Sequence, residues 1–214
     1  MTRIWQRLTI WSAGLPREPH LFIAPSYSIF MVTIFLVKHD DTVQGKKTIQ
    51  YVPQGDSVRR IGDFFQNIPL HKVYTSPEQS TYDTAKRIVG SRGLEVSLIA
   101  SLTARYFASD TPHSRSTRNN HDEIYTRPPC VESSFAHQER VLDMVYHVAG
   151  EHKQETVLMV CDDESNTSIL CRLLDIPLLD SRLIRQDPAC IHRLEIDPLG
   201  QLRGCDINYT QHLR

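Results

Sequence analysis

The chain has 214 residues, of which 40% are hydrophobic and 23% are charged, and its formal net charge at pH 7 is −1. This composition is typical of a globular protein that forms one domain, with or without an appendage, and can bury a sizeable core. Because the net charge is close to zero, the chain has no general attraction for nucleic acid or for an acidic membrane surface. We therefore expect neither as a partner.

The cysteines indicate the redox compartment. They are odd in number and have no C-x-x-C spacing, which argues against a disulfide framework and against a zinc site. The five are Cys130, Cys161, Cys171, Cys190 and Cys205. Free thiols favour a reducing compartment, so we expect a cytoplasmic protein.

Residues 1–30 differ from the rest of the chain, because three arginines and both tryptophans precede the first acidic residue, Glu18. This pattern suits a transit-like leader to an organelle, an amphipathic surface helix, or a start codon assigned too far upstream. Met31 directly precedes the first predicted strand, so we expect an extension at 1–30 and a domain at 31–214. The uncharged stretch from Leu21 to Val37 is interrupted and too short for a membrane span.

The first strand is predicted at Val32–Val37, where six residues rich in β-branched and aromatic side chains follow one another without alternation. Such a run is typical of a strand buried on both faces. It ends abruptly in the polar cluster Lys38-His-Asp-Asp-Thr42. In open α/β sheets the binding site lies beyond the carboxyl ends of the parallel strands, so this cluster is the first candidate site. A strand that simply leaves the core through polar residues would look the same.

Further elements follow in chain order. A helix is predicted after Pro53-Gln-Gly-Asp56, because four apolar residues recur at helical spacing. These are Val58, Ile61, Phe64 and Phe65. Residues 71–75 predict a short strand, and Ser76-Pro77 is predicted to supply the N-cap and first position of a helix that runs to about Gly90. Leu94–Ile99 predicts a third strand.

In the second half of the chain, residues 109–131 are predicted to form a long loop and are a candidate lid. A helix is predicted at Glu132–Val148. Its inward residues are expected to be Phe135, Val141, Leu142 and Val145. Thr156–Cys161 predicts a second fully buried strand, which ends in the carboxylates Asp162-Asp-Glu164, and a helix is predicted at Ser165–Leu174.

Two last strands are predicted at Cys190–Ile196 and Gln201–Ile207, joined by the turn Asp197-Pro-Leu-Gly200. Strands that alternate with helices predict a three-layer α/β/α fold with a doubly wound, mostly parallel sheet. The crossovers should be right-handed, and the final hairpin should form an edge of the sheet.

Five motifs, which span most of residues 32–208, resemble those of the histidine phosphatase superfamily, the phosphoglycerate mutase-like proteins. The family's Arg-His-Gly resembles Lys38-His-Asp40, and its Leu-Thr-x-x-Gly resembles Tyr51-Val-Pro-Gln-Gly55. Its Tyr-x-Ser-Pro-x-x-Arg-Ala-x-x-Thr-Ala resembles residues 74–85. Its Glu-Ser with a later Arg resembles Glu132-Ser133 and Arg140, and its Val-x-His-Gly resembles Val160-Cys-Asp-Asp163. The resemblance implies the same three-layer fold.

The resemblance also implies roles for individual residues, and it implies no cofactor. His39 matches the histidine that accepts the phosphoryl group, and Glu132 is the motif-matched candidate for the proton donor. The substrate-binding candidates are Lys38, Ser80, Asp162 and Thr42. Lys38 and Ser80 stand where the family has its two phosphate-binding arginines, and Asp162 stands where it has its second histidine.

These replacements predict an impaired phosphate site. Lysine keeps the charge of arginine but loses the planar fork that binds two oxygens, and serine at position 80 removes a positive charge. Asp162 places a carboxylate where phosphate oxygens should lie, and a like-charge contact at about 4 Å costs on the order of 4 kcal/mol at an effective dielectric near 20. Asp40 and Asp163, both in place of glycine, add further negative charge.

Three functions therefore remain open. The first is a pseudoenzyme that serves as a binding or regulatory module for a phosphorylated small molecule or a protein partner. The second is a residual phosphatase that uses His39 and Lys38 with other basic residues, such as Arg105 or Arg115.

The third is a divalent-metal site, for which the candidate ligands are His39, Asp40, Asp162 and Asp163. Against it, Asp162 to Glu164 fit equally well as first-turn residues of a helix, stabilised by the macrodipole. His113, His121 and His137 match no standard zinc spacing and are expected on the surface. Cys161 is expected to be an inert buried thiol, because nearby carboxylates raise the pKa of a thiol.

Overall fold

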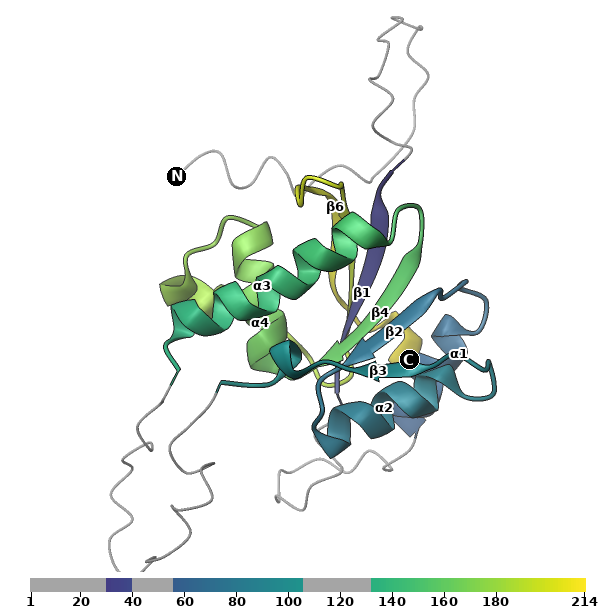
Figure 1. Ribbon diagram of the computed structural model, residues 1–214. Helices are drawn as coiled ribbons and strands as arrows, with labels where there is room; N and C mark the ends of the chain where they lie inside the picture. Colours follow the sequence, from purple (N-terminus) through teal and green to yellow (C-terminus); the bar gives the residue numbers. More distant parts are fainter. Residues whose placement is uncertain (1–29, 40–55, 106–131) are drawn as a thin grey trace, which may run out of the picture.

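A computed structural model describes residues 30–39, 56–105 and 132–214 of the chain (Figure 1). The extension at 1–30, except for its last residue, lies outside these ranges, as do the loop at 109–131 and the residues Asp40 and Thr42. None of the helices in the described ranges is long and apolar enough to cross a membrane.

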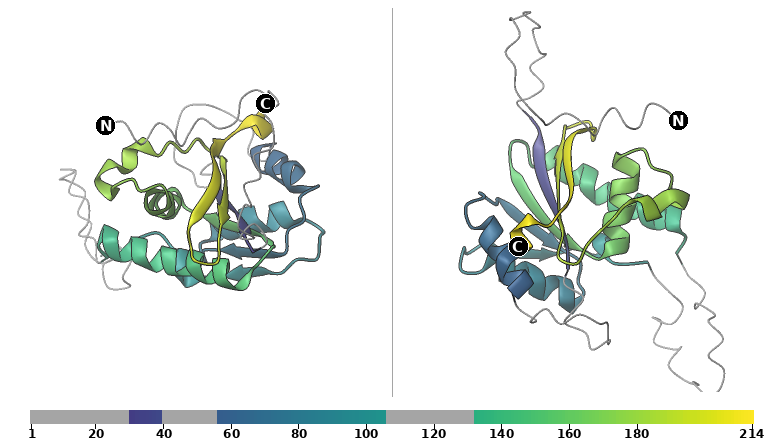
Figure 2. Two further views of the ribbon diagram at one scale, coloured as in Figure 1. Left: turned by 90° about the horizontal axis from the view of Figure 1, so that it is seen from above. Right: turned by 180° about the vertical axis from the view of Figure 1, so that it is seen from behind.

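The described residues form one six-stranded sheet with helices on both faces (Figures 1 and 2). The strands are β1 (Val32–Lys38), β2 (Lys72–Thr75), β3 (Val96–Leu98), β4 (Thr156–Cys161), β5 (Ile191–Ile196) and β6 (Leu202–Tyr209). The α-helices are α1 (Asp56–Phe65), α2 (Gln79–Val89), α3 (Ser134–Glu151) and α4 (Asp163–Leu173). Three short 3-10 helices complete the set: η4 (Ala100–Leu102), η6 (Leu178–Leu183) and η7 (Gln211–Leu213).

The strand order is β3-β2-β4-β1-β5-β6, with β1 near the centre. β1 pairs in parallel with β4, where Val37 lies opposite Val160, and antiparallel with β5, where Val37 lies opposite Ile191. β2 and β3 continue the parallel part, and β6 closes the other edge antiparallel to β5. The structure confirms the predicted doubly wound, mostly parallel sheet with an edge hairpin.

Both faces of β1 are buried, as its continuous apolar sequence predicted. Ile34 and Leu36 belong to one core cluster, which also holds apolar residues of α3 and α4. Phe35 and Val37 belong to the other cluster, beneath α1 and α2, where the rings of Phe35 and Phe65 meet edge to face at 5.1 Å. The sheet therefore separates two cores, and β1 contributes to each.

The hairpin turn is built as predicted. Asp197 Oδ1 accepts hydrogen bonds from the backbone N–H groups of Leu199 and Gln201, both at 2.9 Å. Gly200 has a φ of +76°, a conformation that favours glycine.

Two details of the predicted helices are wrong. Phe135 was expected to face inward, but its side chain is 68% exposed, because it lies in the first turn of α3 before the buried stripe begins. The N-cap of α2 is Glu78, not Ser76. Ser76 instead shares a hydrogen bond of 2.7 Å with Thr81, the two hydroxyl groups facing one another in the core.

β5 carries a buried histidine. His192 is 0% exposed, its Nδ1 accepts a hydrogen bond from the backbone N–H of Asn208 at 3.1 Å, and its Nε2 lies 3.4 Å from Cys190 Sγ. Nε2 therefore carries the proton. Burial disfavours the charged ring and lowers the pKa of His192 to about 4.

We expect this histidine to make the fold sensitive to acid. The unfolded chain binds a proton at His192 below about pH 6.5, whereas the folded chain resists it until about pH 4. The free energy of unfolding should therefore fall by up to about 3 kcal/mol across this window. Urea unfolding at several pH values should show the slope in the wild type and in His147→Gln, an exposed control, but a shallower slope in His192→Gln. Equal slopes in all three proteins would contradict this assignment.

Candidate functional site

The carboxyl ends of β1, β2 and β4 lie next to one another. We call this end of the sheet the strand-end edge, and the residues there the strand-end site. The backbone N–H of His39, just after β1, donates to the carbonyl of Cys161 at the end of β4 over 3.2 Å. Just after β2, the N–H of Ser76 donates to the carbonyl of Val160 over 3.3 Å. The predicted site residues that follow these three strands are therefore brought together.

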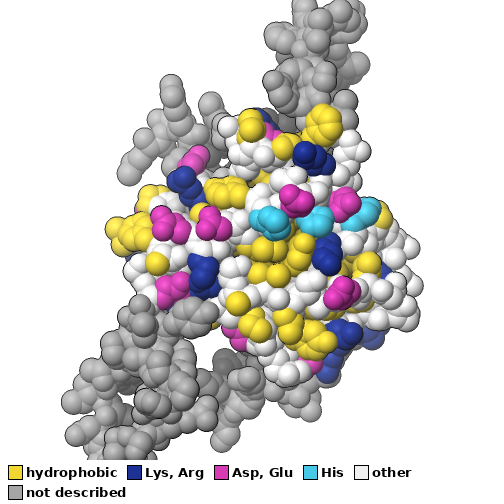
Figure 3. Space-filling view, in the orientation of Figure 1, with side chains coloured by type: hydrophobic (Ala, Val, Ile, Leu, Met, Phe, Trp, Pro, Cys, Tyr) yellow, Lys and Arg dark blue, Asp and Glu magenta, His cyan; other side chains and the backbone are white. Residues whose placement is uncertain are grey.

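Two basic residues in the described part of this edge are paired with acidic residues of α4. Lys38 Nζ lies 3.8 Å from Asp163 Oδ2, and Arg105 Nη2 lies 2.6 Å from Glu164 Oε1. The basic side chains are mostly buried, at 9% and 13% exposed. On the face shown in Figure 3, acidic and basic side chains are likewise interspersed. The site thus pairs each of these cations with a carboxylate of the protein.

Asp162 is the N-cap of α4. Its Oδ1 accepts from the backbone N–H of Ser165 at 2.8 Å, and its Oδ2 accepts from the Ser165 hydroxyl at 2.7 Å. Burial raises the pKa of Asp162, although these two hydrogen bonds oppose the effect. The carboxylate of Asp162, which the resemblance matched to a phosphate-binding histidine, therefore caps its own helix.

His137 was expected on the surface, and this is wrong, because its side chain is completely buried on α3. Nδ1 lies 3.1 Å from Ser168 Oγ, while Nε2 lies 3.2 Å from Ser165 Oγ and 3.3 Å from the Thr103 carbonyl. Burial lowers the pKa of His137. The spacing Ser165-x-x-Ser168, which places two hydroxyl groups on one face of α4, was the only signal of this network in the sequence.

Glu132, the candidate proton donor, is held by Arg140. Arg140 donates from Nε and Nη2 to the two carboxylate oxygens, each at 2.7 Å. Arg140 Nη1 also donates to the carbonyls of Ser101 and Thr103, at 2.9 and 3.1 Å, and so ties α3 to the segment around η4. Both oxygens of Glu132 accept hydrogen bonds from Arg140, which favours the ionised carboxylate. In this geometry Glu132 therefore has no proton to donate.

The segment that follows β2 contributes Glu78, the N-cap of α2, and Ser80. Ser80 lies in the first turn of α2, half-buried, and its carbonyl accepts from the Thr84 hydroxyl at 2.8 Å. Glu78 was missed by the sequence interpretation, and its Oε2 is buried and has no hydrogen-bond partner among the described residues. Burial raises the pKa of Cys161 well above its usual value, and the charges of Asp162 and Glu78 add to the effect. Burial and the raised pKa both disfavour the reactive thiolate at Cys161, which is consistent with the expected unreactive thiol.

A shallow hollow adjoins this edge between α4 and η6. Its lining residues are Asp163, Glu164, Thr167, Ser181, Arg182, Ile184 and Gln186.

Of the proposed metal ligands, Asp40 lies outside the described residues. Within residues 30–39, 56–105 and 132–214, no three histidine, cysteine or acidic side chains are grouped to hold a metal ion.

Comparison with known proteins was made for sequence and for structure. The model of the histidine phosphatase superfamily (branch 1) matches residues 38–203. No curated protein sequence matches the chain closely enough to count as a relative.

Among solved structures, YhfR of Bacillus stearothermophilus is 20% identical, with a TM-score of 0.69 over 86% of this chain and 100% of that one. Phosphoserine phosphatase of Entamoeba histolytica, in complex with 3-phosphoglyceric acid, is 17% identical, with a TM-score of 0.64 over 86% and 100%. The alpha-ribazole phosphatase of Shigella flexneri is 17% identical, with a TM-score of 0.61 over 83% and 96%. At these identities the likeness shows the fold.

We expect the Glu132–Arg140 pair to be structural, and its removal to lower stability. Arg140→Gln leaves a mostly buried carboxylate without its partner and should reduce the free energy of unfolding by about 3 kcal/mol. The double replacement Glu132→Gln/Arg140→Gln should be less destabilised than the sum of the single replacements. Chemical denaturation of the four proteins measures this coupling. Additive effects would show that the two side chains act independently.

Proposed function

Because the chain belongs to the histidine phosphatase superfamily, we propose that it keeps the family's strand-end site as an impaired site. In this proposal it acts as a binding or regulatory module for a phosphorylated small molecule or a protein partner. The observation that carries the proposal is the pairing of Lys38 and Arg105 with Asp163 and Glu164.

The first argument is electrostatic. A phosphate site needs positive charge and N–H donors that are available to the ligand. Here a phosphate that approached Lys38 would meet the carboxylate of Asp163, 3.8 Å from the ammonium group. A like-charge contact near 4 Å costs on the order of 4 kcal/mol at an effective dielectric of 20, which corresponds to several powers of ten in affinity or rate.

The second argument concerns the proton donor. General acid catalysis needs a protonated group within hydrogen-bond reach of the leaving oxygen. Both oxygens of Glu132 accept N–H groups of Arg140, and Asp162 accepts two hydrogen bonds from Ser165. Neither carboxyl group is arranged as a donor, which supports weak or absent turnover.

A second candidate function is residual phosphomonoester hydrolysis with His39 as the phosphoryl acceptor. It is favoured by the position of His39 directly after β1 and by the basic groups Lys38 and Arg105 at the same edge. In this case an incoming phosphate would displace Asp163 and Glu164 from these two cations.

Steady-state hydrolysis of p-nitrophenyl phosphate separates the two candidates. We compare the wild type with His39→Ala and with the double replacement Ser80→Arg/Asp162→His. Our proposal expects no wild-type turnover above the His39→Ala background and a gain in the double replacement, because that protein regains one positive charge and loses one negative charge. Wild-type turnover that disappears with His39→Ala would overturn the proposal and establish the hydrolase.

The pairing itself can be tested by binding of inorganic phosphate. Asp163→Asn/Glu164→Gln removes both carboxylates from the cations and should increase phosphate affinity at least about tenfold, given the cost of a like-charge contact. Isothermal titration calorimetry measures the change. Glu139→Gln/Asp143→Asn, which also removes two negative charges but at exposed positions on α3, is the control for net charge and should leave the affinity unchanged. An equal gain in both variants would show that the pairing does not control the site.

A further inference from the structure

The buried ring of His137, on α3, has a donating side and an accepting side. Nε2 lies 3.3 Å from the Thr103 carbonyl and 3.2 Å from Ser165 Oγ, while Nδ1 lies 3.1 Å from Ser168 Oγ. A carbonyl oxygen can only accept, so Nε2 carries the proton and Nδ1 accepts from the Ser168 hydroxyl. The donating side therefore faces Thr103 and Ser165, and the accepting side faces Ser168.

The donating side of the ring leads to the N-terminus of α4. The Ser165 hydroxyl has a single proton, which it donates to Asp162 Oδ2 at 2.7 Å, and so its oxygen accepts from His137 Nε2. Asp162 also accepts the backbone N–H of Ser165 at 2.8 Å. Two successive hydrogen bonds therefore connect the ring on α3 to the carboxylate that caps α4.

The same N–H group also reaches the segment that carries Arg105. Its second acceptor, the Thr103 carbonyl, lies two residues before Arg105, whereas Ser165 directly follows Glu164. Arg105 Nη2 and Glu164 Oε1 are 2.6 Å apart. One buried donor on α3 thus holds together the two segments that supply this ion pair.

The ion pair depends on this buried network more than the network depends on the pair. Arg105 is 13% exposed and Glu164 is 32% exposed. An ion pair within reach of solvent contributes little by itself, because water screens it and two long side chains must be ordered. Buried hydrogen-bonding groups, in contrast, are costly to leave without partners. The geometry of the pair is therefore set by the hydrogen bonds beneath it.

We propose that His137 is a positioning residue that keeps the strand-end edge closed to anions. It holds Arg105 against Glu164, so that this cation is withheld from a phosphate ligand. The inference rests on the proposed function, in which such pairing impairs the phosphate site. It assigns control of the edge to the donating Nε2 side of the ring, and a purely structural contact to the accepting Nδ1 side.

Substitutions can separate the two sides of the ring. A glutamine places its amide nitrogen near the position of Nε2, and an asparagine places its amide oxygen near that of Nδ1. His137→Asn therefore loses the donor to Thr103 and Ser165, and we expect it to bind inorganic phosphate at least about fivefold more tightly than the wild type. His137→Gln keeps this donor, and Ser168→Ala removes only the contact of Nδ1, so both should match the wild type.

Isothermal titration calorimetry measures the phosphate affinity, and urea unfolding measures the stability of each variant. A merely structural role would lower the stability of all three variants and leave their phosphate affinities equal. Ser165→Ala breaks the same link at its α4 end and tests the inference a second time, without changing His137. It should also raise the phosphate affinity.

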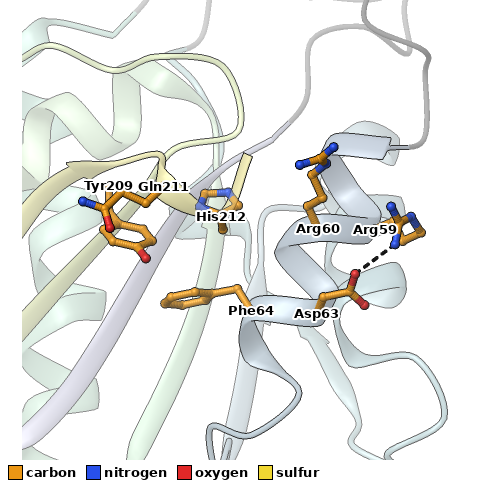
Figure 4. A pocket seen from close by; sticks show the side chains of 7 residues that line it. All are labelled: Arg59, Arg60, Asp63, Phe64, Tyr209, Gln211 and His212. Carbon is orange, nitrogen blue, oxygen red and sulfur yellow. Dashed lines mark hydrogen bonds and ion pairs between the residues drawn. The ribbon is translucent and has the colours of Figure 1, made fainter. Parts of the chain in front are cut away.

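Glu164→Gln and Asp63→Asn separate this inference from the proposed function. Figure 4 shows Asp63 on α1 in an exposed ion pair with Arg59, at 3.1 Å. Asp63→Asn changes the net charge as Glu164→Gln does but leaves the strand-end edge intact, so its phosphate affinity should equal that of the wild type.

Unchanged phosphate affinity in His137→Asn and Ser165→Ala would overturn the inference, and so would an equal gain in His137→Asn and His137→Gln. If Glu164→Gln nevertheless binds phosphate more tightly than Asp63→Asn, the proposed function stands and only the inference fails. If Glu164→Gln gains no affinity, the pairing fails as a basis for both.

Discussion

The burial of β1 on both faces is the constraint on which the rest of the structure depends. This strand is hydrogen-bonded to β4 and β5 along its edges, and helices cover both of its faces. Such a strand can become polar only where it leaves the sheet. Lys38 and His39 therefore stand at the edge where β4 also ends, and this meeting of strand ends brings them next to Asp162 and Asp163.

We propose that the charges at this edge, more than the positions of its residues, determine what it can bind. The N-terminus of α4 stabilises acidic residues through its macrodipole, so Asp163 and Glu164 are favourable for the helix. The same two residues pair with Lys38 and Arg105. In our proposal, an arrangement that stabilises the fold thus also places carboxylates where a phosphate ligand would need to approach. The local stability of α4 and the proposed binding of phosphate then make opposite demands on this turn.

The sequence predicted the elements whose signals are local and missed the contacts that need distant partners. The apolar runs of β1 and β4 and the turn at Asp197 could be recognised from neighbouring residues alone. The burial of His137 could not, because its partners lie on α4 and after η4. The cap of α2 was misplaced by two residues, since the Ser76 hydroxyl bonds Thr81 inside the core instead of the helix end.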